Sequence, residues 1–197
     1  GGIDAGISPP ADGRYTLVAQ IRDRMGQVTE VTSTLTVENA GLPRAYIQNA
    51  EAAYNRSELA IHETLCYSVT VTNESDVPLR TAGPWSGTTY GSGQNFNTLG
   101  WSEESGAFRV GLDCESSLRN YPYRWGLGQP AGELVQVGDY WYLPPRARTV
   151  VSGCVSFDAM PSSNPQHCWV GLIHEDVEIL AANDRVAPHL ITIHSSP

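Results

Sequence analysis

Residues 168–175 read CWVGLIHE, an apolar run that contains Trp, Val, Leu and Ile and ends in charged side chains. Two comparable stretches lie upstream, VVSGCVSF at residues 150–157 and LCYSVTVTN at residues 65–73. Short runs rich in β-branched and aromatic residues favour strands. We therefore predict three strands of one antiparallel β-sandwich, and these strands carry three of the four cysteines.

The segment at residues 63–73 shows the strand pattern most clearly. Successive side chains of a strand point to opposite faces, so the apolar side chains at odd positions from Leu65 to Val71 share one face and Cys66 lies on the other. Similar segments between turn sequences predict an all-β fold with about seven to nine strands after residue 44 and no convincing helix. We expect strands at residues 45–50, 63–73, 108–114, 121–128, 140–143, 149–157, 168–174 and 188–194.

Composition excludes several classes of partner. The formal net charge is −9, which repels phosphate backbones, so we expect no nucleic-acid partner. All 12 basic residues are Arg, a bias that a GC-rich genome would also produce. No apolar run approaches the roughly 18 residues that a membrane-spanning helix needs, so we expect no membrane span.

The N-terminal part of the chain predicts a β-hairpin. Two alternating segments within residues 14–37 are joined by the turn sequence DRMG at residues 23–26. A lone hairpin cannot bury its apolar face. The hairpin therefore either completes a preceding sandwich or packs on the strands C-terminal to it. On this basis we divide the chain into residues 1–41 and residues 42–197.

Residues 81–106 break the alternation and predict an irregular insertion. Long loops in compact domains are usually functional or disordered, and the aromatic side chains here favour packing or binding. Aromatic rings stack on sugars or anchor protein partners, although they build cores equally well. Both interpretations stay open for the candidate contact residues, which are Trp85, Tyr90, Phe96, Trp101 and Trp141.

The four cysteines favour two disulfides in an oxidising compartment. Their spacings of 48, 40 and 14 residues contain no C-x-x-C pair and fit no zinc knuckle or ribbon. Buried free thiols in a cytosolic protein are the alternative.

Several short motifs occur in a characteristic order along the chain. They are DGRYTL at residues 12–17, VTVTNESDVP at 69–78, LPP at 143–145, VSGCV at 151–155 and WVGLIHE at 169–175. This order resembles the Ig-like and fibronectin type III-like sandwich modules of bacterial cell-surface and secreted proteins. The resemblance implies an Ig-like Greek-key sandwich, residues 42–197, preceded by the hairpin of a neighbouring repeat, residues 1–41.

The resemblance also bears on the disulfide pairing. In Ig topology the strands of Cys66 and Cys154 are neighbours in one sheet, and those of Cys114 and Cys168 are neighbours in the other. We therefore prefer the pairs Cys66–Cys154 and Cys114–Cys168, which require the paired residues to lie directly opposite each other. An antibody-like bond between the sheets, from Cys66 to Cys168 against Trp125, is the rival.

Nothing in the sequence forms a persuasive catalytic site, and we expect no cofactor or metal site. There is no nucleophile elbow, phosphate-binding loop or H-E-x-x-H motif. The cluster His174-Glu175-Asp176 is the densest polar group, and we expect it to be a solvent-exposed strand end.

The function we expect from the sequence is that of a non-enzymatic extracellular structural or adhesive module of a cell-surface protein, with self-assembly into a filament or layer. Its partners would be other protein domains of the same or neighbouring chains. A carbohydrate-binding module that uses the aromatic residues of the insertion is the alternative, and glycans would then be its partners.

Overall fold

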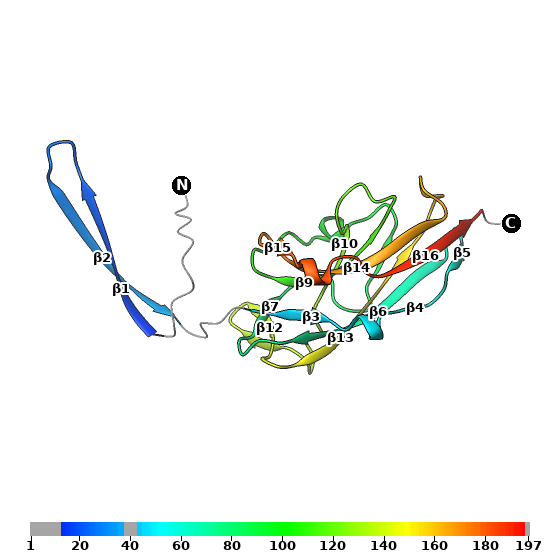
Figure 1. Cartoon of the computed structure of the whole chain (residues 1–197), viewed down its shortest axis with the longest axis horizontal. Coiled ribbons are helices and arrows are strands. Elements are labelled where there is room, and N and C mark those ends of the chain that lie inside the picture. Colours follow the sequence, from blue (N-terminus) through cyan, green and yellow to red (C-terminus); the bar gives the residue numbers. More distant parts are fainter. Residues whose placement is uncertain (1–12, 38–42, 196–197) are drawn as a thin grey trace. The chain divides into compact units, whose positions relative to one another are not determined.

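The computed structural model describes residues 13–37 and 43–195, which are drawn in colour in Figure 1. The chain divides into two compact units, Gly1–Leu42 and Pro43–Pro197. The first unit holds strands β1 and β2, and the second holds the other strands of the described residues.

The first unit contains an amphipathic β-hairpin. Strands β1 (Gly13–Arg22) and β2 (Val28–Val37) pair antiparallel, with Leu17 opposite Ser33. The predicted turn is present, and Asp23 closes it by accepting hydrogen bonds from the backbone N–H groups of Met25 and Gln27. One face of the hairpin is rich in large apolar side chains, and they are exposed: Leu17 (52%), Ile21 (64%), Val31 (56%) and Leu35 (40%).

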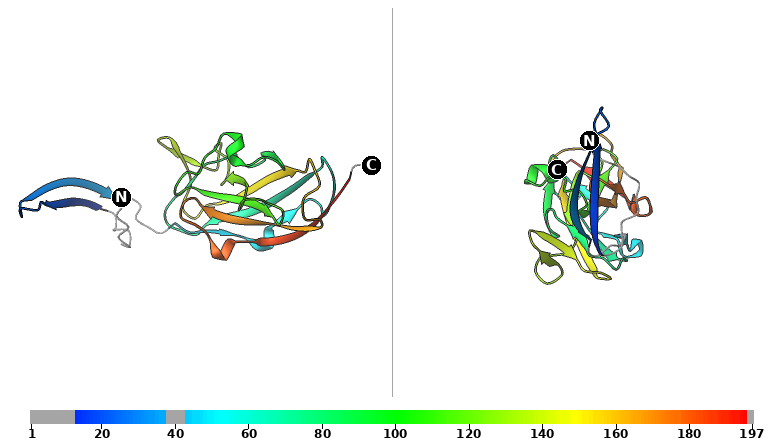
Figure 2. Two further views of the ribbon diagram at one scale, coloured as in Figure 1. Left: turned by 90° about the horizontal axis from the view of Figure 1, so that it is seen from above. Right: turned by 90° about the vertical axis from the view of Figure 1, so that its left-hand side faces the viewer.

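The second unit consists of two β-sheets packed as layers, as the sequence predicted (Figures 1 and 2). The larger sheet has the strand order β11-β12-β7-β9-β14-β16-β5, with β10 beside β9 and β15 beside β14. Its strands are β5 (Glu58–Ala60), β7 (Leu79–Thr81), β9 (Phe108–Cys114), β10 (Tyr123–Gly126), β11 (Val135–Val137), β12 (Tyr140–Leu143), β14 (Gln166–His174), β15 (Glu178–Ile179) and β16 (Val186–His194).

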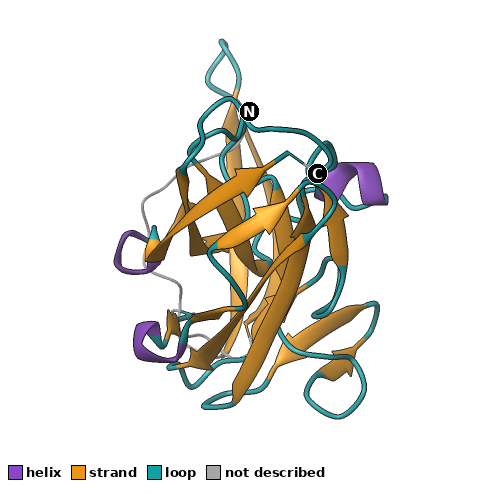
Figure 3. Cartoon of the chain, turned by 90° about the vertical axis from the view of Figure 1, so that its right-hand side faces the viewer, coloured by secondary structure: helices purple, strands orange, loops and turns teal. Residues whose placement is uncertain are grey.

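The smaller sheet has the order β3-β6-β13-β8, with β4 also paired to β6. Its strands are β3 (Ala45–Ile47), β4 (Ala53–Tyr54), β6 (Thr64–Asn73), β8 (Thr89–Gly91) and β13 (Arg148–Ser156). Three short 3₁₀ turns lie at the periphery of the unit (Figure 3), namely η1 (Asn49–Glu51), η2 (Phe96–Leu99) and η3 (Ala181–Asn183). None of the helical turns in the described residues has the length or apolar character needed to cross a membrane.

The expectation of wholly antiparallel sheets is wrong, because both sheets are mixed. Strand β8 pairs parallel to β13, β7 parallel to β9, and β5 parallel to β16. Each of these three strands is only three residues long. Strand β8 lies inside the segment expected to be irregular, so part of the insertion adds an edge to the smaller sheet.

The core lies between the sheets and is centred on Trp125, which is fully buried. Tyr67 and Tyr90 contact this indole edge-on, with ring centroids 5.1 and 4.9 Å from it. Gly153 makes room for the ring, because a Cβ atom at that position would overlap the indole. The odd-numbered apolar residues of β6 are buried as the alternation predicted.

The cysteines form the two preferred disulfides, Cys66–Cys154 and Cys114–Cys168. Each pair lies directly opposite in register, Cys66 with Cys154 between β6 and β13, and Cys114 with Cys168 between β9 and β14. The Cα atoms of each pair are 4.0 Å apart. The disulfides therefore join neighbouring strands within a sheet, and the rival bond between sheets is not formed.

Candidate functional site

The five predicted contact residues separate into two groups. Tyr90 and Phe96 lie in the core with exposures of 0% and 2%, so they are not available to a ligand. The Tyr90 hydroxyl donates a hydrogen bond to the Arg124 carbonyl oxygen at 2.7 Å. The Phe96 ring lies under the guanidinium groups of Arg109 and Arg124, 5.3 and 4.4 Å from its centroid. For these two residues the core interpretation holds.

The three tryptophans of the set meet at the surface. Trp85, Trp101 and Trp141 are partly buried and line one hollow of about 310 Å³. The other lining residues are Thr81, Ala82, Glu104, Asp139 and Tyr140. We call this hollow the tryptophan cleft. Its volume is at the lower end of the roughly 300 to 1,000 Å³ usual for small-molecule sites.

Two of the tryptophans come from the predicted insertion and hold each other in place. The rings of Trp85 and Trp101 meet edge to face, with centroids 6.1 Å apart and planes at 79°. Trp85 packs over Gly126, where a Cβ atom would come within 2.7 Å of the indole. The backbone of Trp101 is fixed through its N–H, which donates to Phe96, and its carbonyl oxygen, which accepts from Asn97. The rings are thus positioned before any ligand arrives.

The third tryptophan reaches the cleft through sheet pairing. Trp141 lies on β12 directly opposite Thr81 on β7. Because β7 leads into the loop that carries Trp85, this pairing brings Trp141 and Trp85 to one site although they are far apart in the sequence. In the described residues none of the three indole N–H groups has a hydrogen-bond partner.

Charged groups border the cleft. Arg80 Nη2 lies 2.7 Å from Glu104 Oε2, and Nη1 donates to the Ser105 carbonyl oxygen. The Arg80 guanidinium also lies 4.0 Å above the ring of Tyr140. Asp139 is exposed in the turn between β11 and β12, and its carboxylate has no partner among the described residues.

Sequence reasoning missed Tyr140, Glu104 and Asp139 as parts of the site. Tyr140 stands next to the predicted Trp141, so the YWY run at residues 140–142 was the available signal. Glu104 and Asp139 gave none, because only the pairing of β12 with β7 brings them to the same hollow.

A second hollow, of about 380 Å³, lies at loops that include Ser92–Asn95 and Ser116–Arg119. Its lining mixes small polar residues with Leu118, Met160 and prolines, and its two aromatic residues, Tyr123 and Phe157, are buried in the core. It therefore offers no exposed ring on which a ligand could stack, and we regard the tryptophan cleft as the candidate site.

The expectation that His174-Glu175-Asp176 is a solvated strand end is wrong for Glu175. This carboxylate is 2% exposed and accepts from Arg109 at 3.0 Å and from Arg124 at 2.7 Å. Arg109 is itself fully buried and donates to the carbonyl oxygens of Ala82 and Ser102. Burial lowers the pKa of Arg109, and the charge of Glu175 opposes that effect. The cluster is a structural ionic network that anchors the loops leading to Trp85 and Trp101.

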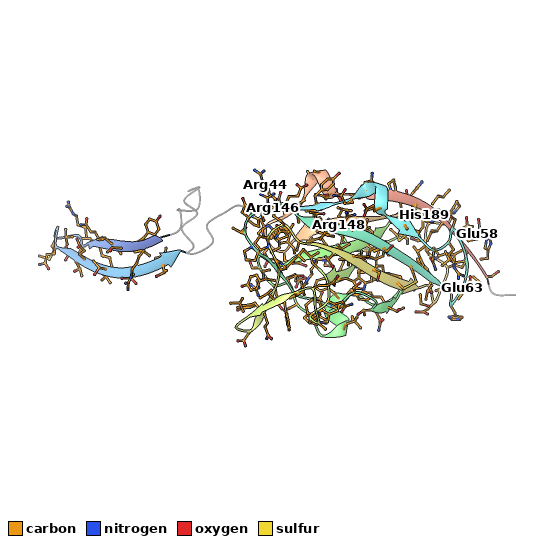
Figure 4. All side chains as sticks on the ribbon, turned by 90° about the horizontal axis from the view of Figure 1, so that it is seen from below. Arg44, Glu58, Glu63, Arg146, Arg148 and His189 are labelled. Carbon is orange, nitrogen blue, oxygen red and sulfur yellow. A yellow bond between two sulfur atoms is a disulfide. The ribbon has the colours of Figure 1, made fainter. Side chains whose placement is uncertain are left out.

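The histidines have local structural contacts. His189 stacks on Tyr54 with ring centroids 4.5 Å apart, and its Nε2 atom lies 2.9 Å from the Arg56 carbonyl oxygen. It lies near Glu58, at the end of the unit opposite Arg146 (Figure 4). His174 stacks on Phe108 at 4.1 Å. Within residues 13–37 and 43–195, no three His, Cys, Asp or Glu side chains are grouped so that they could hold a metal ion.

Comparisons of the chain with protein-family models, with curated proteins and with solved structures find no match.

Proposed function

We propose that this protein is a non-enzymatic, extracellular adhesive module that binds carbohydrate in the tryptophan cleft. The observation that carries the proposal is the grouping of Trp85, Trp101 and Trp141 around one hollow of about 310 Å³. Indole faces stack against the apolar faces of sugar rings, and their N–H groups donate to hydroxyl oxygens. A few polar groups among aromatic walls are typical of ligand sites.

The proposed setting rests on the disulfides and the fold. Disulfides persist in oxidising compartments, and the two formed here are typical of secreted proteins and cell-surface domains. The layered, mixed β-sheets support a sandwich module. The motif order supports the finer proposal, an Ig-like Greek-key domain of a bacterial surface protein.

A glycan array tests the proposal directly. We expect the chain of residues 1–197 to bind a defined subset of glycans, and Trp85→Ala or Trp141→Ala to weaken that binding about fivefold or more, since an aromatic contact contributes on the order of 1 kcal/mol. Tyr46→Ala is the matched control, because Tyr46 is a partly exposed aromatic on β3 in the other sheet. Thermal unfolding of each variant separates loss of binding from loss of fold. Absence of binding to every glycan, or binding that survives both substitutions, would refute the proposal.

The apolar face of the hairpin favours a second candidate function, structural self-association. Leu17, Ile21, Val31 and Leu35 form one face of an isolated two-stranded sheet and are all at least 40% exposed. An isolated hairpin is marginally stable in water, and packing its apolar face against a second sheet removes that face from water. The occupant we propose is the same face of a second copy of this chain.

Sedimentation velocity tests this second candidate. We expect the chain of residues 1–197 to dimerise or form larger species, and Ile21→Lys with Val31→Lys to return it to a monomer because each places a charge in the contact. Gln20→Lys with Thr32→Lys is the matched control, since these side chains lie on the opposite, mostly polar face of the same hairpin. If the chain of residues 1–197 stays monomeric at high concentration, this function is excluded.

A further inference from the structure

We propose that the tryptophan cleft selects sugars that carry a protonated amine over neutral and acidic sugars. This inference rests on the carbohydrate-binding function proposed above and names the class of glycan. Its basis is the combination of three indole rings with an unpaired carboxylate, Asp139, at the same hollow.

The charges at the cleft leave one negative group uncompensated. Glu104 is neutralised by Arg80, whose Nη2 atom lies 2.7 Å away. Arg80 is the nearby cation that would repel an amine, but its guanidinium is already engaged by Glu104, the Ser105 carbonyl oxygen and the Tyr140 ring. Asp139 has no such partner among the described residues. The lining itself contains no Lys, Arg or His.

The aromatic lining strengthens the same preference. Tryptophan is the side chain whose ring face attracts cations most strongly, and the attraction grows as the cation loses water. The three tryptophans therefore provide favourable positions for an ammonium group, whereas a hydroxyl at the same position gains only an ordinary contact. The net charge of −9 adds a longer-range attraction for cationic polymers.

Asp139 is held at the rim by the turn between β11 and β12. Val137 pairs with Tyr140, so Gly138 and Asp139 form a two-residue hairpin loop, with Gly138 at a φ of 59°. A positive φ at the first loop position favours Gly, and Asp or Asn suits the second. Asp139→Asn therefore removes the charge and preserves the turn.

The test compares ligands that differ only in the amine. Isothermal titration with the chain of residues 1–197 at pH 5.5 uses a fully deacetylated β-1,4-glucosamine hexamer, its N-acetylated form and cellohexaose. We expect the glucosamine hexamer to bind about tenfold more tightly than cellohexaose, from the ion pair and the cation–π contact together. The preference should shrink in high salt, because exposed charges are screened.

The variants distinguish the amine selectivity from the carbohydrate-binding function on which it rests. Asp139→Asn should reduce the amine preference, measured as the ratio of the affinities for the glucosamine hexamer and cellohexaose, to about threefold or less, the part left to cation–π contacts. Trp85→Ala should weaken the binding of both hexamers.

Equal binding of the glucosamine hexamer and cellohexaose by the native chain would overturn the amine selectivity and leave the carbohydrate-binding function standing. Failure of all three hexamers overturns the amine selectivity, and the glycan array then shows whether any carbohydrate binds. A preference that survives Asp139→Asn at full size would also overturn the assignment to Asp139.

Discussion

The side chain of Asn73 is fully buried at the end of β6, and its amide joins three segments of the chain. Its Nδ2 atom donates to the carbonyl oxygens of Val77, Leu143 and Pro144, and its Oδ1 atom accepts from the N–H and hydroxyl of Ser75. Asn73 starts the sequence N-E-S, which matches a glycosylation acceptor, but a buried amide of this kind is not accessible to modification.

We expect Asn73→Ala to lower the free energy of unfolding by about 2–3 kcal/mol, because buried groups then lose their partners. The control is Asn120→Ala, since that side chain is exposed and has no hydrogen bond among the described residues. Denaturant unfolding measures both. A loss at Asn73 no larger than at Asn120 would show that the network is not stabilising.

His174 makes the stability depend on pH through its partial burial against Phe108. Burial lowers the pKa of His174, and Glu178 and a backbone hydrogen bond with Gly106 only partly oppose that effect. A group whose pKa is lower in the folded state stabilises the fold at pH values above its unfolded pKa, near 6.5. That contribution is lost as the pH falls through the folded pKa.

We therefore expect the native chain to lose more stability than His174→Phe between pH 7.5 and pH 5. Phenylalanine keeps an aromatic ring on Phe108 and does not titrate. Urea unfolding at several pH values gives the difference between the two proteins. Parallel pH profiles for the native chain and the variant would contradict the assignment of this dependence to His174.

At the scale of elements, a pair of glycines on β9 and β14 leaves room for a tyrosine ring that packs against both strands. Gly111 and Gly171 are directly opposite in register, and a Cβ atom on either would overlap Tyr121. The Tyr121 hydroxyl donates to Asp184 and accepts from the backbone N–H of Arg185. The ring thus ties two strands of the larger sheet to the segment that enters β16.

We expect Gly171→Ala to destabilise the protein by about 1–3 kcal/mol, because the methyl group displaces the ring from a well-packed site. The atoms nearest to that Cβ position all belong to Tyr121. In a Tyr121→Ala background the same substitution should therefore cost much less, and a double-mutant cycle measures this coupling. Additive losses would mean that the ring and the glycines act independently.

Sequence periodicity predicted the long strands well and the short ones poorly. Alternation located β6, β9 and β13, and a continuous apolar run located β14. The same period of two placed Cys66 on the face opposite the apolar side chains of its strand. Strands of three residues, such as β5, β7 and β8, are too short to show a period, and their parallel pairing depends on how distant segments pack. The expectation of purely antiparallel sheets was therefore wrong.

The candidate site was only partly predictable for a related reason. The sequence identified the aromatic residues, but of Tyr90 and Trp85, five residues apart in one segment, the first is fully buried and the second only partly. The burial of Glu175 depends on Arg109 and Arg124, which are 66 and 51 residues away in sequence. Local patterns do not record such contacts, so the composition of the cleft required the structure.

At the scale of the whole molecule, the buried core and the disulfides that stabilise the second unit lie within its own residues, Pro43–Pro197. Every described residue of the buried core falls in this range, as do both disulfides. The disulfides close stretches of 88 and 54 residues, and bonds that close long loops each stabilise by about 2–4 kcal/mol. Because each bond stays within one sheet, cohesion between the sheets depends on the packing around Trp125.

This distribution predicts that residues 43–197 fold without residues 1–42. We expect a chain of residues 43–197 to unfold cooperatively with a midpoint within about 2 °C of that of the same unit in the chain of residues 1–197, since a domain with its own core folds as a unit. Differential scanning calorimetry measures both midpoints, and mass measurement before and after reduction checks that both disulfides form. Self-association should be lost with the hairpin, whereas glycan binding in the tryptophan cleft should persist unchanged. A shorter chain that misfolds, or that unfolds many degrees below the chain of residues 1–197, would show that the hairpin stabilises the sandwich rather than serving as a separate contact surface.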